Sequence, residues 1–131
     1  MSSKKPLYTV PVPSTSFLKE AYWDGRRTSP AILFEYEKNG ANYRGGIEFH
    51  RVLAMRHRTE RCCTAWHVEG AYDTLVEVEG SPWVQEMRAE TNQQWRDKWE
   101  THHYMIYLDS VGCFEVIAES CDALPEEIQQ K

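Results

Sequence analysis

Apolar and polar side chains alternate along residues 31–37, and this alternation predicts a half-buried strand. The face expected to be buried carries Ile32, Phe34 and Tyr36. Asn39-Gly40 follows directly and is typical of a tight hairpin turn. We therefore expect a second, antiparallel strand that runs from about Tyr43 toward Arg56.

The second strand has two irregular places. Gly45-Gly46 indicates either a β-bulge or a close approach of another backbone, because glycine has no side chain to pack. Farther along, the apolar set changes phase between Phe49 and Val52, which is the effect of one extra residue in a strand. We therefore expect a bulge near His50-Arg51.

The clearest helix start is Ser81-Pro82. The serine hydroxyl accepts hydrogen bonds from the first free backbone N–H groups, and proline at the first helical position loses no hydrogen bond. The apolar stripe that follows consists of Trp83, Val84, Met87 and Thr91. This pattern predicts one main helix over about 82–93, and Trp95 and Trp99 extend the stripe beyond a polar segment.

Shorter segments predict minor elements. Proline at positions 11 and 13 confines a strand over 7–12 to a sheet edge, because proline cannot donate a hydrogen bond. Helical spacing predicts a helical turn within 16–23, and apolar content predicts strands in 62–68 and 72–78, with a helical turn as the alternative for 72–78. Residues 1–6 and about 122–131 are expected to be loosely ordered.

The last apolar segments, 103–108 and 114–119, predict a hairpin. A three-residue loop, Ser110-Val111-Gly112, uses glycine in the left-handed conformation. A two-residue loop instead brings Ile106 beside Glu115, and burying a carboxylate without a partner is costly. The three-residue loop is therefore favoured. It gives one apolar face with the pairs Leu108–Phe114, Ile106–Val116 and Tyr104–Ala118.

Together these elements predict a single α+β domain over residues 1–131. We expect an antiparallel sheet of about five to seven strands with the main helix packed on one face. The chain then ends in the C-terminal β-hairpin. Its 131 residues suit one domain, and its 41% hydrophobic content suffices for a core.

The net charge of the chain indicates which classes of partner it can bind. The net charge is −5, from 15 basic and 20 acidic residues, which argues against nucleic-acid binding because phosphate contacts need a basic face. No apolar run approaches the length of a membrane helix, and no secretory signal is visible. We therefore expect a cytoplasmic protein without membrane contact.

The histidine and cysteine residues lack the spacing of a metal site. Zinc ligands commonly come in pairs separated by two to four residues, but Cys62 and Cys63 are adjacent and no C-x-x-C or H-x-x-x-H occurs. These two cysteines, with Cys113 and Cys121, are expected to be reduced thiols. We expect neither a metal nor a cofactor.

Basic and acidic residues in the middle of the chain are candidates for a small-ligand site. Arginine offers a bidentate fork to phosphate or carboxylate groups. The competing interpretation is that these arginines pair with nearby glutamates or are simply solvated. No catalytic residue is predicted. The predicted ligand-binding residues are Arg56, Arg58, His67, Tyr72 and Asp73.

Two tryptophans in a polar segment are candidates for a partner-binding surface. Trp95 and Trp99 lie among Gln93, Gln94 and charged residues, and an aromatic side chain in such surroundings suits a partner anchor. The competing interpretation is that both side chains cover the sheet edge.

Two segments give the chain a resemblance to known sequences. Residues 95–119, beginning Trp-Arg-Asp-Lys-Trp, and residues 71–78, Ala-Tyr-Asp-Thr-Leu-Val-Glu-Val, resemble small bacterial proteins of unknown function. The resemblance spans about two-thirds of the chain. It implies a bacterial, cytoplasmic protein and brings no activity with it.

Three functions are compatible with these observations. Small size, acidic charge and the absence of a catalytic signature favour a non-enzymatic protein-binding module, for example an immunity-type inhibitor of a basic partner. The first alternative is a small-ligand-binding protein or enzyme with a cleft lined by arginine, histidine and aspartate. The second alternative is a homodimeric structural module joined through a sheet edge or through Trp95 and Trp99.

Overall fold

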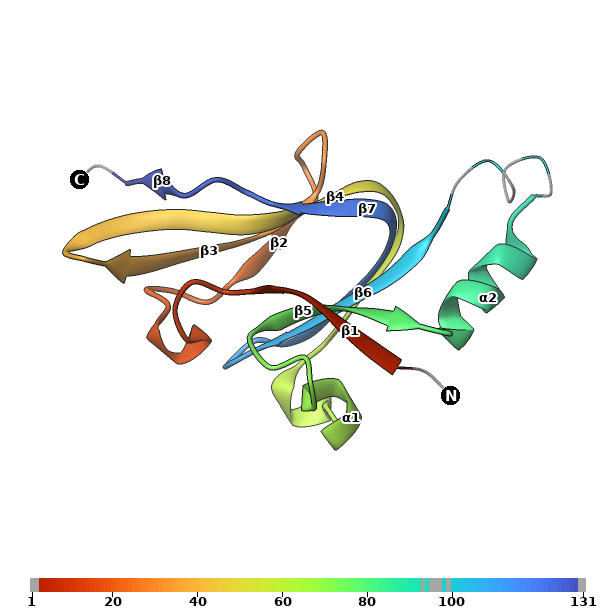
Figure 1. The fold of residues 1–131 in the computed structure, drawn as a ribbon, viewed down its shortest axis with the longest axis horizontal. Helices are drawn as coiled ribbons and strands as arrows, with labels where there is room; N and C mark the ends of the chain where they lie inside the picture. Colours follow the sequence, from red (N-terminus) through yellow and green to blue (C-terminus); the bar gives the residue numbers. More distant parts are fainter. Residues whose placement is uncertain (1–2, 93, 95–97, 99, 130–131) are drawn as a thin grey trace.

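The computed structural model describes residues 3–92, 94, 98 and 100–129 (Figure 1). Its main feature is one eight-stranded sheet in the order β1-β5-β6-β7-β4-β3-β2, with β8 paired to β4. All pairings between these strands are antiparallel, which confirms an α+β fold with an antiparallel sheet. The strands are β1 (Ser3–Thr9), β2 (Tyr22–Asp24), β3 (Ala31–Lys38), β4 (Ala41–Arg58), β5 (Thr74–Glu79), β6 (His102–Leu108), β7 (Gly112–Ala123) and β8 (Glu127–Ile128).

Within the part of the chain that the structure describes, two short helices and two 3-10 turns accompany the sheet. The helices are α1 (Ala65–Val68) and α2 (Pro82–Glu90), and the 3-10 turns are η1 (Ser14–Ser16) and η2 (Glu60–Cys62). None of the described helices has the length and apolar character that crossing a membrane requires.

The sheet bends sharply along β4. This strand pairs with β3 through its first part and with β7 through its second part. Figure 1 shows β4 and β7 curving together, so that the two arms of the sheet face each other across the core. Arg51 has a φ of 55°, and the β4–β7 register shifts between Val52 and Ala54, so β4 does contain a bulge, about two residues beyond the expected position at His50-Arg51.

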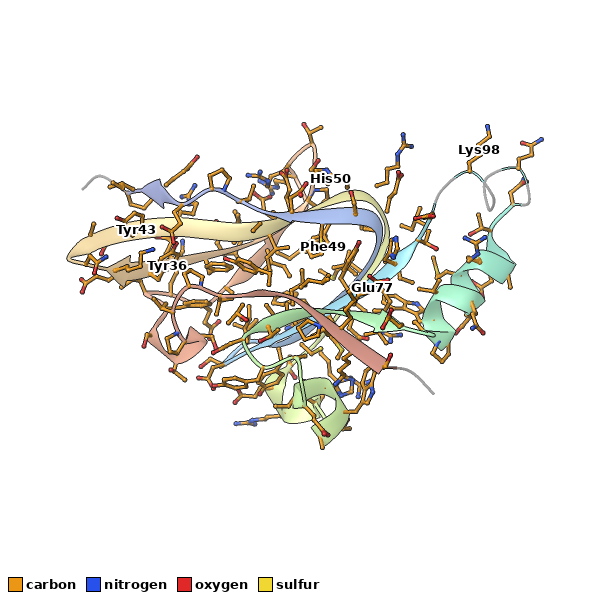
Figure 2. All side chains as sticks on the ribbon, viewed as in Figure 1. Tyr36, Tyr43, Phe49, His50, Glu77 and Lys98 are labelled. Atoms are coloured by element: carbon orange, nitrogen blue, oxygen red, sulfur yellow. The ribbon has the colours of Figure 1, made fainter. Side chains whose placement is uncertain are left out.

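The alternation along β4 separates core from surface at this bend. Figure 2 shows Phe49 between the two arms of the sheet and His50 on the outer side. Phe49 is fully buried and packs with residues from both arms, including Phe34, Leu75 and Tyr104. The predicted strand over 31–37 and its turn at Asn39-Gly40 are confirmed, because β3 and β4 pair from Ala31 to Lys38.

Gly46 allows the close packing of β3 on β4. A Cβ atom at this position would lie 2.5 Å from the carbonyl oxygen of Ile32, a distance that no side chain tolerates. The register of β3 and β4 is continuous through Gly45 and Gly46. Of the two alternatives for this pair of glycines, the close backbone approach is therefore the one that the protein uses.

The hairpin of β6 and β7 is partly confirmed. Its loop is Asp109 to Val111, so Leu108 pairs with Gly112 and Ile106 pairs with Phe114. The predicted register was therefore wrong by two residues. A shift of two leaves every side chain on the same face. All six residues predicted for the apolar face are consequently in the main core: Tyr104, Ile106, Leu108, Phe114, Val116 and Ala118.

The other face of β5, β6 and β7 carries a second, smaller core. Val76, Met105 and Cys113 are buried there, and Val68 of α1 and Cys63 pack against them. The main helix was predicted to pack on one face of the sheet, but it does not cover either face. α2 lies beyond the end of β5 and contacts β6, and none of its residues is buried (Figure 1).

α2 begins as predicted but ends earlier. Ser81 Oγ accepts the N–H of Val84, which confirms the serine cap. The helix ends at Glu90 rather than at about residue 93, because the polar segment from Glu90 onward has no apolar side chain to hold against the sheet.

Two further predictions of local structure were wrong. The segment 16–23 holds the last residue of η1 and the first two residues of β2 instead of a helical turn. The segment 62–68 contains α1 instead of a strand, because Thr64 and His67 form a reciprocal cap that starts a helix.

The chain ends are more ordered than predicted. Ser3 to Pro6 belong to β1, where pairing with β5 satisfies their backbone groups. Asp122 and Ala123 belong to β7, and β8 pairs with β4. β1 is the outer strand of the sheet, so the edge position predicted for the first strand is confirmed, although its bounds differ.

Candidate functional site

A groove of about 320 Å³ opens between α1 and α2, on the face of the sheet opposite the main core. Trp66 of α1 forms one wall, and Trp83 of α2 forms the other. Arg56 of β4 and His103 of β6 also line it. The remaining lining residues are Val78, Ser81, Pro82 and Glu86.

A chain of hydrogen bonds runs beneath this groove. Ser81 Oγ lies 2.7 Å from His103 Nδ1, and His103 Nε2 lies 2.8 Å from Glu115 Oε1. Ser81, His103 and Glu115 are 4%, 2% and 2% exposed. We call these three residues the buried relay. They come from the start of α2, from β6 and from β7, so the sheet and the helix cap hold the geometry.

Arg56 bonds to Glu115 of the buried relay and lies at the surface of the groove. Its Nε and Nη2 atoms donate to the two carboxylate oxygens of Glu115 at 2.9 and 3.1 Å. The guanidinium carbon lies 3.8 Å from the centre of the Trp83 ring, a cation–π stack. Trp83 also meets His103 edge-on at 5.1 Å, so its indole covers both Arg56 and His103.

The carboxyl of Glu115 stays ionised. Burial alone would raise its pKa, but the hydrogen bonds from His103 and Arg56 outweigh burial and lower the pKa to about 2. An ionised carboxylate only accepts hydrogen bonds, so His103 Nε2 must be the donor. In the neutral imidazole Nδ1 is then the acceptor, and the hydroxyl of Ser81 donates to it.

Several cations surround the groove. Burial and the neighbouring charges of Arg58, Arg56 and Lys4 lower the pKa of His67, although Glu115 partly opposes them. Lys4 of β1 lies 4.7 Å from the Trp66 ring and donates to the backbone oxygens of Trp66 and Glu69. Basic residues therefore gather at this face together with the acids Glu69, Glu86 and Glu115, although the chain as a whole is acidic.

The five predicted ligand-binding residues do not form a single cleft. Arg56 lines the groove, and Arg58 and His67 lie close enough to interact electrostatically beside it. Tyr72 instead stacks on Tyr107, and Asp73 accepts the backbone N–H of Ser14 at 3.1 Å. Of the five predicted residues, the structure thus places only Arg56 in the lining of the groove, and it leaves Tyr72 and Asp73 away from it.

Sequence reasoning missed most of this site. Ser81 was interpreted only as a helix cap, and neither His103 nor Glu115 was among the predicted site residues. A carboxylate between Phe114 and Val116 was the available signal, because a glutamate in so apolar a segment needs a buried partner. Arg56 and His103, the cationic and polar residues of the two neighbouring strands, were the partners to test.

A second cluster lies on the outer side of the bend. His50 Nε2 is 2.9 Å from Asp122 Oδ2 and 3.6 Å from Glu48 Oε1 (Figure 2 labels His50). These three side chains offer one imidazole and two carboxylates within 4.8 Å, a donor set that can ligate a cation. Each is already engaged, since Arg27 pairs with Glu48 at 3.3 Å.

Comparison with known proteins adds no family to this picture. No protein-family model, curated protein or solved structure matches the chain. The resemblance to small bacterial proteins therefore stays a prediction. Trp95 and Trp99, the predicted partner anchors, lie outside the described residues.

Proposed function

We propose that the chain is a small-ligand-binding protein and that its groove between Trp66 and Trp83 binds a planar organic anion. The observation that carries this proposal is the Arg56 guanidinium, stacked on Trp83 and held along one edge by Glu115. A guanidinium fixed in this way is pre-organised, so ligand binding costs little additional side-chain entropy.

The walls of the groove suit a flat ligand. Trp66 is 40% exposed, so part of its indole is accessible to a ligand, with the Lys4 ammonium 4.7 Å from the ring centre. The volume of about 320 Å³ lies at the lower end of the range for small-molecule sites, which favours a ligand with one or two rings.

The charge of the groove supports an anion. Lys4, Arg56 and Arg58 act together on His67, so a negative group entering beside Arg56 meets a favourable potential. Glu115 compensates one of these charges from below, but it is buried and does not face the ligand. Glu86 at the rim works against an anion and limits the net attraction.

The proposal is tested with 2-naphthoate and its uncharged analogue 2-naphthol, using calorimetric titration. We expect 2-naphthoate to bind and 2-naphthol to bind at least tenfold more weakly. Trp66→Ala should weaken 2-naphthoate binding about tenfold or more, because one stacking wall is lost. Tyr72→Ala is the matched control, since Tyr72 is 42% exposed and lies outside the groove.

Two outcomes contradict the proposal. One is the absence of 2-naphthoate binding at millimolar concentration to the folded protein. The other is an equal loss of affinity in Trp66→Ala and Tyr72→Ala, which would place the ligand elsewhere or show that binding is nonspecific.

The two other functions stay predictions. The prediction of a protein-binding module depends on the net charge of −5 and on the two tryptophans Trp95 and Trp99. A homodimer joined through a sheet edge is opposed by β1, whose outer edge carries Lys4, Lys5 and Pro6, and by the short β2 at the other edge. Charged residues, proline and short strands are the features that discourage edge pairing.

A further inference from the structure

We propose that Ser81 is a nucleophile for acyl transfer, with His103 as its general base, and that the groove hydrolyses small carboxylic esters. This inference deepens the proposed function, because it assigns chemistry to the same groove. It rests on the buried relay and on its position against the groove wall, where both Ser81 and His103 are lining residues.

The direction of the hydrogen bonds suits this role. With His103 as the neutral imidazole protonated at Nε2, that nitrogen donates to Glu115, and Nδ1, 2.7 Å from Ser81 Oγ, accepts from the serine hydroxyl. The serine proton therefore already points at the base that would remove it. A nucleophile, a base and a carboxylate that orients the base are the three parts that activated serines share.

Arg56 has a positioning role in this arrangement. It holds the Glu115 carboxylate in place through two hydrogen bonds and keeps it available for His103. When His103 takes up a proton, the buried carboxylate stabilises the resulting imidazolium. Trp83, packed over His103 and Arg56, limits the access of water to both.

The start of α2 supplies the electrostatic setting for the reaction. Ser81 is the N-cap of this nine-residue helix, and the N–H of Val84 points at Ser81 Oγ from 3.3 Å. In this first turn Pro82 has no N–H, and the N–H groups of Val84 and Gln85 bond to Ser81, so the N–H of Trp83 and the helix dipole remain to stabilise negative charge. A tetrahedral intermediate on Ser81 would place its oxyanion near this helix end.

The reaction balances without any group beyond water. Ser81 Oγ forms a bond to the ester carbonyl carbon, its proton moves to His103 Nδ1, and the carbonyl electrons move onto oxygen. On collapse, the bond to the alcohol oxygen breaks and that oxygen takes the proton from His103. Water then attacks the acyl-serine by the same route and releases the carboxylic acid. Its carboxylate is an anion of the class proposed for the groove.

A purely structural role for the relay is the competing explanation. Anchoring a helix start to a sheet needs no ionised glutamate, because a well-packed apolar side chain serves equally well or better than a buried ion pair. The relay also ends at a groove rather than within the core. Both features favour a chemical role.

The test combines covalent labelling with ester hydrolysis. The intact protein is incubated with phenylmethylsulfonyl fluoride, and the site of modification is mapped by mass spectrometry of its peptides. Initial rates of p-nitrophenyl acetate hydrolysis are measured for the parent protein, Ser81→Ala, His103→Gln and Ser14→Ala. Ser14 is the matched control, because it is also a buried serine bonded to a carboxylate but has no histidine partner.

We expect label on Ser81 and a loss of about 100-fold or more in the hydrolysis rate for Ser81→Ala and His103→Gln. Ser14→Ala should keep the parent rate, and 2-naphthoate should slow the labelling. Mapping on the parent protein needs no variant, so a folding defect in Ser81→Ala does not remove the test.

The results separate this inference from the proposed function. If 2-naphthoate binds but Ser81 takes no label and Ser81→Ala keeps the parent rate, the inference is overturned and the binding function stands. If Ser81 is labelled and required for hydrolysis while 2-naphthoate does not bind, the inference stands and the proposed ligand class is wrong.

Discussion

His103 and Glu115 lie diagonally across the adjacent strands β6 and β7, joined by a hydrogen bond of 2.8 Å that solvent barely reaches. Glu115 pairs directly with Met105, and His103 is two residues away on the same face. A buried carboxylate in this position is stable only while its partners are present, because an unpaired buried charge costs several kcal/mol.

The first prediction concerns acid stability. The pKa of Glu115 is about 2 in the folded protein, below its ordinary value of 4.5. The unfolded chain therefore takes up this proton first as the pH falls. The stabilisation is complete above about pH 5 and is lost toward pH 2, amounting to about 3 kcal/mol. Urea unfolding at several pH values measures it.

Glu115→Gln isolates this contribution from the other carboxylates. The variant should be less stable than the parent at neutral pH, and it should lose about 2–3 kcal/mol less between pH 6 and pH 2.5. Glu126→Gln is the control, since its ion pair with Lys38 is partly exposed and is weakened by solvent screening. An equal loss of unfolding free energy between pH 6 and pH 2.5 in the parent and in Glu115→Gln would refute the prediction.

Much of the fold was predictable because local patterns agreed with the final packing. Alternation identified β3, Asn39-Gly40 identified its turn, and Ser81-Pro82 identified the start of α2. The apolar face of the hairpin was also found, although its register was wrong by two residues. Registers that differ by two residues bury the same face, so the pattern alone does not separate them.

The site was less predictable because it joins distant segments of the chain. Arg56 was identified as a ligand-binding candidate, but its partner Glu115 is 59 residues away in the sequence. Tyr72 and Asp73 were predicted to line the same site. The structure instead places both immediately before the start of β5, whereas the groove lies at the other end of that strand, where Val78 and Ser81 line it.

The second prediction concerns Gly112 at the start of β7. Its φ is 104°, and a Cβ atom there would lie 2.2 Å from the backbone oxygen of Arg58. Gly112→Ala therefore combines backbone strain with a collision that only a backbone shift relieves. We expect a loss of at least about 3 kcal/mol in the free energy of unfolding.

Gly40→Ala is the matched control for Gly112. Gly40 also has a positive φ, of 80°, but nothing lies within 4 Å of its missing Cβ. Only the conformational cost remains, about 1 kcal/mol. Urea denaturation of both variants measures the difference, and equal losses would show that the collision at Gly112 is relieved without cost.

The third prediction separates Asp73 from ligand binding. Its carboxylate accepts from the backbone N–H and the hydroxyl of Ser14, and Ser14 Oγ in turn accepts the N–H of Asp109 at 2.9 Å. Asp73→Asn keeps the shape and tolerates the positive φ, but it weakens these bonds. We expect a loss of about 1–2 kcal/mol in stability and unchanged affinity for 2-naphthoate. If the folded variant loses affinity for 2-naphthoate, Asp73 contributes to ligand binding and the prediction is wrong.

The fourth prediction concerns the four cysteines, all of which are free thiols as expected from the sequence. Burial raises the pKa of Cys63, and it raises the pKa of Cys121 to about 11. The pKa of Cys113 is raised most strongly, because the charge of Glu115 adds to the effect of burial. Because the thiolate is the reactive form, these three should react slowly with a disulfide reagent, whereas Cys62 is exposed and should react first. Timed mapping of the modified peptides measures this order, and Cys62→Ser should remove the fast phase. Rapid modification of Cys113 in the folded protein would mean that the strands around Glu115 open readily, which the buried relay should prevent.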